Sequence, residues 1–112
     1  MKPKSTRENR RNPRTTTSKG IWVSWQADGH RVVSRVRDVS TGGVFVSTHT
    51  PAPVGATVTL LFSLPEGETR MEGIVRYENA KTGMGIEFTR MGMGDKARLR
   101  ELLRRLSSGR DS

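Results

Sequence analysis

Residues 71–88 read MEGIVRYENAKTGMGIEF, and this stretch decides the fold class. Apolar or small residues recur at every second position on each side of a polar turn at 79–82. They are Met71, Gly73, Val75 and Tyr77 before the turn and Met84, Ile86 and Phe88 after it. Successive side chains of a strand point to opposite faces of a sheet, so a period of two is typical of a strand with one buried face. The stretch therefore predicts two antiparallel strands joined by a short turn.

Four further runs of this kind precede the pair. Segments rich in Val, Thr, Ile and aromatic residues cover residues 21–25, 31–39, 44–46 and 57–62. Turn-forming residues separate the runs, at Asp28-Gly29, Gly42-Gly43 and Pro65-Glu66-Gly67. Six short strands at this spacing predict an all-β domain, either a small antiparallel sandwich or a barrel. Inward side chains fill a barrel of this size, so a ligand is expected on its rim or outer wall.

The last part of the chain predicts one helix, over residues 95–106. Its leucines recur at i, i+3, i+4 and i+7, which places Leu99, Leu102, Leu103 and Leu106 on one face. We expect this face to pack on the β domain. Asp95 is expected to cap the helix, and Ser107, Ser108 and Gly109 are expected to end it. Residues 107–112 are then a disordered tail.

Positive charge is concentrated near the N-terminus. The chain has 112 residues, 20 Lys and Arg, 11 Asp and Glu, and a net charge of +9. Residues 1–19 contain seven of the cations and a single acid, Glu8. This segment has too few large apolar side chains to offset the entropy of ordering, so we expect it to be mobile without a partner. A chain this basic is expected to bind an anionic partner, such as a nucleic acid, a nucleotide or an acidic membrane surface.

Several classes of protein are excluded. The chain has no cysteine, which excludes a disulfide framework, a zinc finger and a thiol nucleophile. No apolar run approaches the ~20 residues that span a bilayer, and no signal-peptide pattern follows the basic N-terminus, so we expect a cytoplasmic protein. His30 and His49 lack the spacing of a metal site, and the sequence has neither a Gly-x-Ser-x-Gly elbow nor a phosphate loop. We therefore predict a non-enzyme without cofactor or metal.

Two short motifs carry the predicted binding chemistry. Arg10 and Arg14 form Arg-x-x-x-Arg, and Asp38, Ser40 and Gly43 form Asp-x-Ser-x-x-Gly. Guanidinium groups fit phosphate oxygens and the O6/N7 edge of guanine bidentately. A carboxylate and a hydroxyl accept hydrogen bonds from the N1–H and N2–H₂ groups of guanine, and glycines let the backbone approach a flat ring. A ligand that has both guanines and phosphates would use both motifs.

Each motif also has a simpler explanation. Arg7 and Arg11 repeat the arginine spacing, which shows how readily it arises in an arginine-rich segment. Asp-x-Ser-x-x-Gly also suits an ordinary polar turn between two strands, in which the side chains bond to nearby backbone. The two motifs together, in this order and with a predicted hairpin between them, are more specific than either alone.

The motif pair resembles that of the PilZ domain, the bacterial receptor module for cyclic di-GMP. Residues 73–76 and 83–88 resemble two later strands of that family, and residues 95–106 resemble its C-terminal helix. The resemblance covers residues 9–106 and implies a six-stranded antiparallel β-barrel with a C-terminal α-helix. It divides the chain into a basic tail (1–8), a flexible arm (9–19), a barrel (20–90), the helix (95–106) and the C-terminal tail.

The resemblance also implies a function and a set of site residues. It implies that Arg10 and Arg14 hold phosphates and guanine edges, while Asp38 and Ser40 contact a guanine. Gly43 completes the motif, and Arg11 and Gly42 are additional candidate contacts. The implied protein is a stand-alone receptor that orders its arm on cyclic di-GMP and signals to an effector protein, for example in motility or surface polysaccharide control.

Two alternatives belong to other classes of function. A small basic barrel could stack single-stranded nucleic acid on Trp22 or Trp25, with Arg31, Arg35 and Arg37 along one strand face. The low aromatic content of 5% argues against this alternative. A PilZ-like scaffold that binds only protein is the other alternative.

Overall fold

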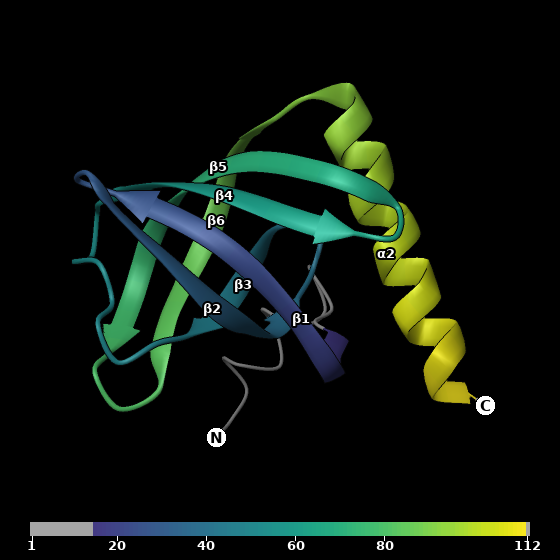
Figure 1. Cartoon of the computed structure of the whole chain (residues 1–112), viewed down its shortest axis with the longest axis horizontal. Helices are drawn as coiled ribbons and strands as arrows, with labels where there is room; N and C mark the ends of the chain where they lie inside the picture. Colours follow the sequence, from purple (N-terminus) through teal and green to yellow (C-terminus); the bar gives the residue numbers. More distant parts are fainter. Residues whose placement is uncertain (1–14, 112) are drawn as a thin grey trace, which may run out of the picture.

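A computed structural model describes the backbone of residues 15–111 and the side chains of residues 21–107. This part of the chain forms six strands and one helix, and Figure 1 shows how they are arranged. They are β1 (Thr15–Ala27), β2 (His30–Val39), β3 (Gly43–Ser47), β4 (Thr57–Leu64), β5 (Gly67–Asn79), β6 (Gly83–Met91) and α2 (Met93–Asp111). The strands pair antiparallel in the order β1-β2-β3-β6-β5-β4, and β4 returns to β1 to close a barrel. The predicted six-stranded antiparallel barrel with a C-terminal helix is confirmed.

The barrel interior is filled by alternate residues of all six strands. Side chains exposed by 2% or less include Val23, Val36, Val46, Leu60, Phe62, Val75 and Ile86. The pairing of Val23 with Phe62 across β1 and β4 brings the first and fourth strands together at the closure. Burying an aliphatic or aromatic side chain of this size contributes about 1.5–3 kcal/mol. Because the interior is occupied by apolar side chains, polar binding groups must lie on the outer wall or at the ends.

The hairpin predicted at Asp28-Gly29 is confirmed. Both residues have positive φ, 51° and 78°, and Ala27 pairs with His30 across the two-residue turn. This is the geometry of a type I′ turn, whose twist matches that of the flanking strands.

Strand β1 begins earlier than the sequence predicted. We placed residues 15–19 in the arm, but the strand starts at Thr15, and the register pairs Thr15 with Val39 and Thr16 with Asp38. An irregularity between Thr16 and Ile21 shifts the register, after which the ladder runs to the hairpin. Threonine is β-branched and favours strands, so the threonine run extends β1 past the closed part of the barrel.

Helix α2 packs its leucine face on the barrel, as predicted. Leu99 and Leu102 are buried with the core, and Leu103 and Leu106 pack partly buried against it. Figure 1 shows the helix lying along one side of the barrel, next to the turn between β4 and β5. Across the described residues, no helix has the length and apolar character needed to cross a membrane.

The predicted ends of the helix were wrong. It begins at Met93 and continues to Asp111, past the serines and the glycine that we expected to end it. Asp95 is not the N-cap residue, because the helix begins two residues before it; its carboxylate accepts the backbone N–H of Arg70 on β5 at 3.0 Å. A serine or a glycine lowers the stability of a helix by at most about 1 kcal/mol, so these residues are tolerated near the end of α2.

Two carboxylates anchor α2 to the barrel. The hydrogen bond from the Arg70 backbone lowers the pKa of Asp95, and Arg98 adds to this effect. The Arg105 guanidinium binds Glu66 in the β4–β5 turn through two nitrogens, and this hydrogen bonding lowers the pKa of Glu66. The Glu66 side chain is only 7% exposed, whereas that of Arg105 is 43% exposed, so solvent reaches this ion pair from the arginine side.

Candidate functional site

The Asp-x-Ser-x-x-Gly motif lies at the end of β2 and forms the turn into β3. The backbone N–H of Ser40 donates to the carbonyl of Gly43 at 2.9 Å. The Ser40 hydroxyl accepts the N–H groups of Gly42 at 3.1 Å and Gly43 at 3.2 Å. Ser40 is 1% exposed, and its side chain stabilises the turn through these hydrogen bonds. A direct contact between its hydroxyl and a guanine stays a prediction.

Gly43 is required by the close approach of β6. A Cβ atom at this position would lie 2.4 Å from the carbonyl oxygen of Ile86, which is far inside contact distance. The neighbouring Gly42 carbonyl accepts the N–H of Phe88 at 2.9 Å. Neither Gly42 nor Gly43 is among the residues with positive φ. We predicted that these glycines allow a tight turn and let the backbone approach a flat ring of the ligand. In the structure, Gly43 instead lies close to the β6 backbone.

Asp38 lies on the outer wall of the barrel, one step before the turn. Its side chain is 16% exposed, and one of its carboxylate oxygens lies 3.8 Å from Nε of Arg37. A register irregularity between Val36 and Asp38 places Asp38 opposite Phe45 of β3. A partly exposed carboxylate beside a guanidinium can accept hydrogen bonds from a ligand that reaches this part of the wall.

An aromatic platform continues the outer wall from Asp38, and sequence reasoning missed it. The Arg37 guanidinium carbon lies 4.1 Å from the ring centroid of Phe45, and the rings of Phe45 and Tyr77 are 5.9 Å apart and tilted by 34°. Gly85 lies between them in register, and a Cβ there would lie 2.2 Å from the Tyr77 ring. Gly85 lies on β6 between Met84 and Ile86, the strand that the alternation of apolar residues predicted. The glycine in the middle of an alternating strand was the available signal for an overlying ring.

The arginine motif lies outside the described residues, as do Arg10, Arg11 and Arg14 individually. The register nevertheless limits where this segment joins the barrel. Thr15 pairs with Val39, and opposite residues in an antiparallel pair have Cα atoms about 4.5–5.5 Å apart. Arg14 precedes Thr15 in the sequence, so β1 begins directly after the arginine motif and beside the Asp38–Gly43 turn.

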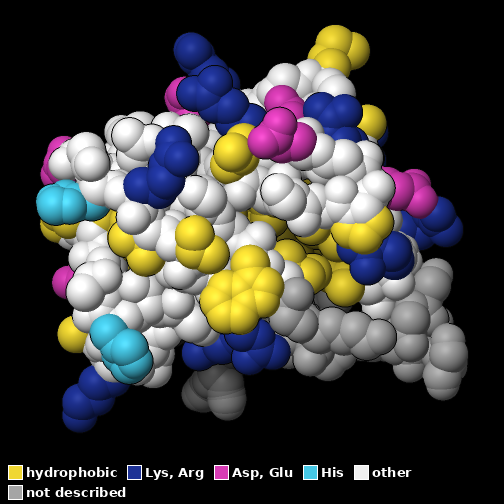
Figure 2. All heavy atoms as spheres, in the orientation of Figure 1, with side chains coloured by type: hydrophobic (Ala, Val, Ile, Leu, Met, Phe, Trp, Pro, Cys, Tyr) yellow, Lys and Arg dark blue, Asp and Glu magenta, His cyan; other side chains and the backbone are white. Residues whose placement is uncertain are grey.

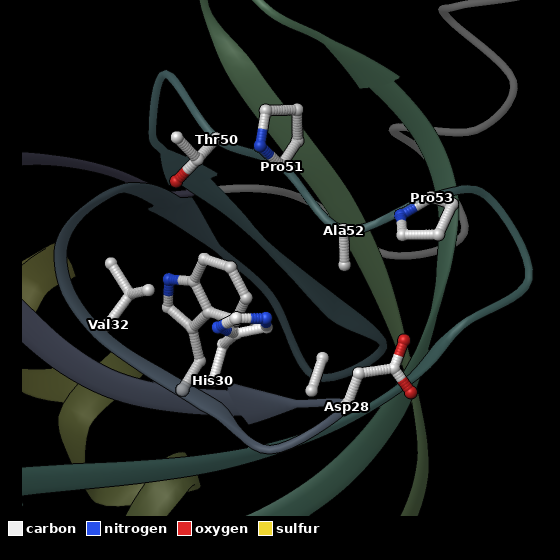
Figure 3. A pocket seen from close by; sticks show the side chains of 9 residues that line it. Asp28, His30, Val32, Thr50, Pro51, Ala52 and Pro53 are labelled. Atoms are coloured by element: carbon white, nitrogen blue, oxygen red, sulfur yellow. The ribbon is translucent and has the colours of Figure 1, made fainter.

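A hollow lies at the end of β2 that is far from the motif turn, about nine residues or roughly 30 Å along the strand. Figure 3 shows its walls, which come from the β1–β2 hairpin and the loop that follows β3. It has a volume of about 390 Å³ and is lined by Trp25, Ala27, Asp28, His30, Val32, Thr50, Pro51, Ala52 and Pro53. Lysine and arginine are absent from this lining, so the hollow does not offer the cations that a phosphate requires.

The two histidines are exposed, as expected for solvated side chains. Within the part of the chain that the structure describes, no three His, Asp or Glu side chains gather as metal ligands would.

The fold and the site together define a class of small closed antiparallel β-barrels, with a polar turn and a carboxylate on the outer wall and one flanking C-terminal helix. The PilZ domain family model matches residues 8–105. The chain therefore belongs to the PilZ domain family.

Solved structures with the same fold include other members of this family. The Klebsiella pneumonia MrkH–cyclic di-GMP complex is 18% identical, with a TM-score of 0.72 over 90% of this chain and 52% of that chain. The PilZ domain of Escherichia coli YcgR with cyclic di-GMP is 14% identical, with a TM-score of 0.71 over 88% of this chain and 92% of that chain. The PilZ domain of CeSA from a cellulose-synthesizing bacterium is 19% identical, with a TM-score of 0.66 over 84% and 97%.

These identities establish a shared fold. The chain spans about half the length of the MrkH chains and of the Bacillus subtilis motility inhibitor MotI, which it also resembles. No curated protein matches the sequence.

Proposed function

We propose that this domain is a receptor for cyclic di-GMP. The single observation that carries the proposal is the register of β1 and β2, which pairs Thr15, the residue that follows Arg14 in the sequence, with Val39 beside Asp38. Family membership supports it, and the related MrkH and YcgR structures contain cyclic di-GMP. The basic N-terminal segment supplies the positive charge that a ligand with two phosphates needs.

Each motif residue has a distinct role in the proposed complex. Arg10 and Arg14 bind phosphates and guanine edges, and Arg11 adds charge. Asp38 accepts the N1–H and N2–H₂ groups of a guanine on the outer wall. Ser40 acts through the turn: its hydroxyl holds the N–H groups of Gly42 and Gly43, and this fixes the backbone that leads away from Asp38.

Signalling follows from the ordering of the arm. Two phosphates and two guanines offer enough charge-assisted hydrogen bonds to order a segment that has so few large apolar side chains. The ordered arm and the barrel wall then form a surface that differs from that of the free protein. We propose that an effector protein in the bacterial cytoplasm reads this surface, as in motility or surface polysaccharide control.

One observation favours a second candidate, a single-stranded nucleic-acid binder. Trp22 is 56% exposed, and it lies opposite Arg35 in the β1–β2 register. Figure 2 shows hydrophobic side chains exposed over β1, with Lys and Arg side chains around them. Trp25 offers no such platform, because it is 3% exposed and its indole N–H donates to the Ser34 hydroxyl at 2.9 Å. That part of the nucleic-acid hypothesis was wrong.

Isothermal titration calorimetry tests the proposal directly. We expect heat of binding with cyclic di-GMP and much less with cyclic di-AMP, whose adenines lack the N2–H₂ donor. A single-stranded RNA of ten nucleotides serves as the competing ligand, and its affinity should fall steeply with salt if the second candidate is right. A folded protein that gives no heat with cyclic di-GMP overturns the receptor proposal.

A further inference from the structure

A hollow of about 390 Å³ lies directly beside the motif turn. Its walls come from the turn, from the last part of β6 and from the first turn of α2, and the lining residues are Thr41, Phe88, Thr89, Arg90, Met91 and Lys96. We propose that this hollow is an anion subsite that receives a phosphate of the nucleotide bound at the Asp38–Gly43 turn. The inference rests on the proposed function and extends the ligand surface onto β6 and α2.

The hollow and the turn are adjacent, because backbone hydrogen bonding joins the turn to β6. Phe88 donates its N–H to the Gly42 carbonyl at 2.9 Å, and Gly43 lies opposite Glu87 in the β3–β6 register. Thr41 belongs to the turn and also lines the hollow. A ligand that rests on the turn can therefore extend into the hollow without crossing a strand.

The two cations of the hollow are not neutralised by any residue that the structure describes. Arg90 and Lys96 are exposed, and neither forms an ion pair within residues 21–107. This holds even though Glu72 lies opposite Arg90 in the β5–β6 register. Two cations that share one hollow create a positive potential, and an arginine can bind two oxygens of a phosphate at once.

The nearest carboxylates along the chain are engaged elsewhere. Glu87 accepts a hydrogen bond from Nε of Arg76 at 2.5 Å, on the side of the sheet toward β5. Asp95 accepts the Arg70 backbone N–H and also pairs with Arg98 at 3.2 Å. Neither carboxylate lines the hollow, so the charged side chains of its lining are those of Arg90 and Lys96.

The lining also suits the rest of a nucleotide. Phe88 and Met91 are half-buried and give the hollow an apolar wall, against which a ribose or the edge of a base can pack. The hollow at the far end of the barrel has the opposite character, because its only ionisable lining groups are Asp28 and His30 (Figure 3). The chemistry of the lining thus assigns the anion to the hollow beside the turn.

A matched pair of double variants tests the subsite. Arg90→Gln/Lys96→Gln removes the two cations of the hollow. Lys81→Gln/Arg100→Gln removes two exposed cations that lie outside it, so both variants have the same net charge. We expect the affinity for cyclic di-GMP to fall about tenfold or more in the first variant and to change less than about twofold in the control. Thermal melts of both variants check that the fold is intact.

Salt dependence supplies a second measurement. If a phosphate sits between Arg90 and Lys96, the affinity of the hollow variant should depend less on salt than that of the wild type and the control. Inorganic pyrophosphate is titrated alone and as a competitor of cyclic di-GMP. These titrations distinguish a site for the phosphate of the nucleotide from a site that binds only free anions. Loss of pyrophosphate binding with unchanged cyclic di-GMP affinity means an adventitious anion site only and overturns the inference.

The outcomes separate this inference from the function on which it rests. If the wild type gives no heat with cyclic di-GMP, the receptor proposal fails, and the subsite for its phosphate fails with it. If the wild type binds but the hollow variant binds as well as the control, only the subsite is overturned.

Discussion

Thr16 of β1 lies opposite Asp38 of β2 in the antiparallel barrel. This pairing connects two parts of the chain that are 22 residues apart, and it lies only one residue beyond the point where the basic N-terminal segment joins β1. The register of these two strands thus places the first described residues of β1 beside the carboxylate of the motif.

Replacing Arg14 should remove most of the binding. In Arg14→Ala, a ligand phosphate loses a charge-assisted partner, which is worth about 1.5–3 kcal/mol, so the affinity for cyclic di-GMP should fall at least tenfold. Calorimetry measures the change, and Lys81→Ala, which removes an exposed cation in the β5–β6 turn, is the matched control. Equal affinities of the two variants would contradict a role for Arg14.

Replacing Asp38 should affect selectivity more than overall attraction. The Asp38→Ala variant loses the acceptor for N1–H and N2–H₂ of guanine, while the arginines that attract phosphate stay in place. We expect the ratio of affinities for cyclic di-GMP and cyclic di-AMP to fall about tenfold. If the ratio is unchanged in calorimetric titrations, Asp38 does not read the base.

Ser40→Ala should lower stability as well as binding. The substitution leaves the N–H groups of Gly42 and Gly43 without the hydroxyl that they bond, and an unsatisfied buried group costs about 1–3 kcal/mol. Denaturant unfolding of Ser40→Ala and of Ser63→Ala, an exposed serine on β4, measures the difference. A stability equal to that of the Ser63 variant would show that the turn does not need this hydroxyl.

Gly43→Ala should weaken the pairing of β3 with β6. The added methyl group meets the Ile86 backbone carbonyl, which cannot rotate away as a side chain would, so we expect a loss of about 1–3 kcal/mol. Gly94→Ala in the first turn of α2 adds the same group where its nearest contacts lie at 3.4 Å or more, and it should be neutral or stabilising. Thermal unfolding compares them, and a Gly43 variant as stable as the Gly94 variant would refute the close approach.

Stability should fall in acid because α2 is anchored by two carboxylates whose pKa values are lowered in the fold. Each contributes fully above the ordinary pKa values of 4.5 for Glu66 and 3.8 for Asp95. As the pH falls below these values, the unfolded chain takes up the protons first, so the free energy of unfolding decreases until the folded groups are also protonated. Unfolding curves between pH 7 and pH 3 measure this slope.

The variant Glu66→Gln separates the anchor from general acid effects. We expect it to be less stable than the wild type at pH 7 and to lose less stability toward pH 3, because it lacks a carboxylate whose pKa is lowered in the fold. Glu68→Gln, at an exposed position on β5, removes the same charge and is the matched control for stability at pH 7. Identical slopes for the wild type and the Glu66 variant would exclude a contribution from the Glu66–Arg105 pair.

Local patterns predicted the strands and the helix face well, and they predicted the ends of elements poorly. The alternation of Met84, Ile86 and Phe88 located β6, since a period of two depends only on neighbouring residues. The start of β1 was missed because Thr15 is held by its pairing with Val39. The role of Asp95 was missed for the same kind of reason, since its partner Arg70 is 25 residues away.

The sequence by itself determined a small all-β domain with a cationic N-terminus and a turn-forming Asp-x-Ser-x-x-Gly, because these features depend on residues close together in the chain. Only the tertiary structure decided which strands are neighbours. The barrel closes with β3 beside β6, which brings Phe45, Gly85 and Tyr77 into one row. The same pairing places Gly43 where a Cβ atom would meet the backbone carbonyl of Ile86. The same closure places Arg90 and Lys96 beside Thr41. Contacts of this kind follow from strand order and register, which local periodicity does not encode.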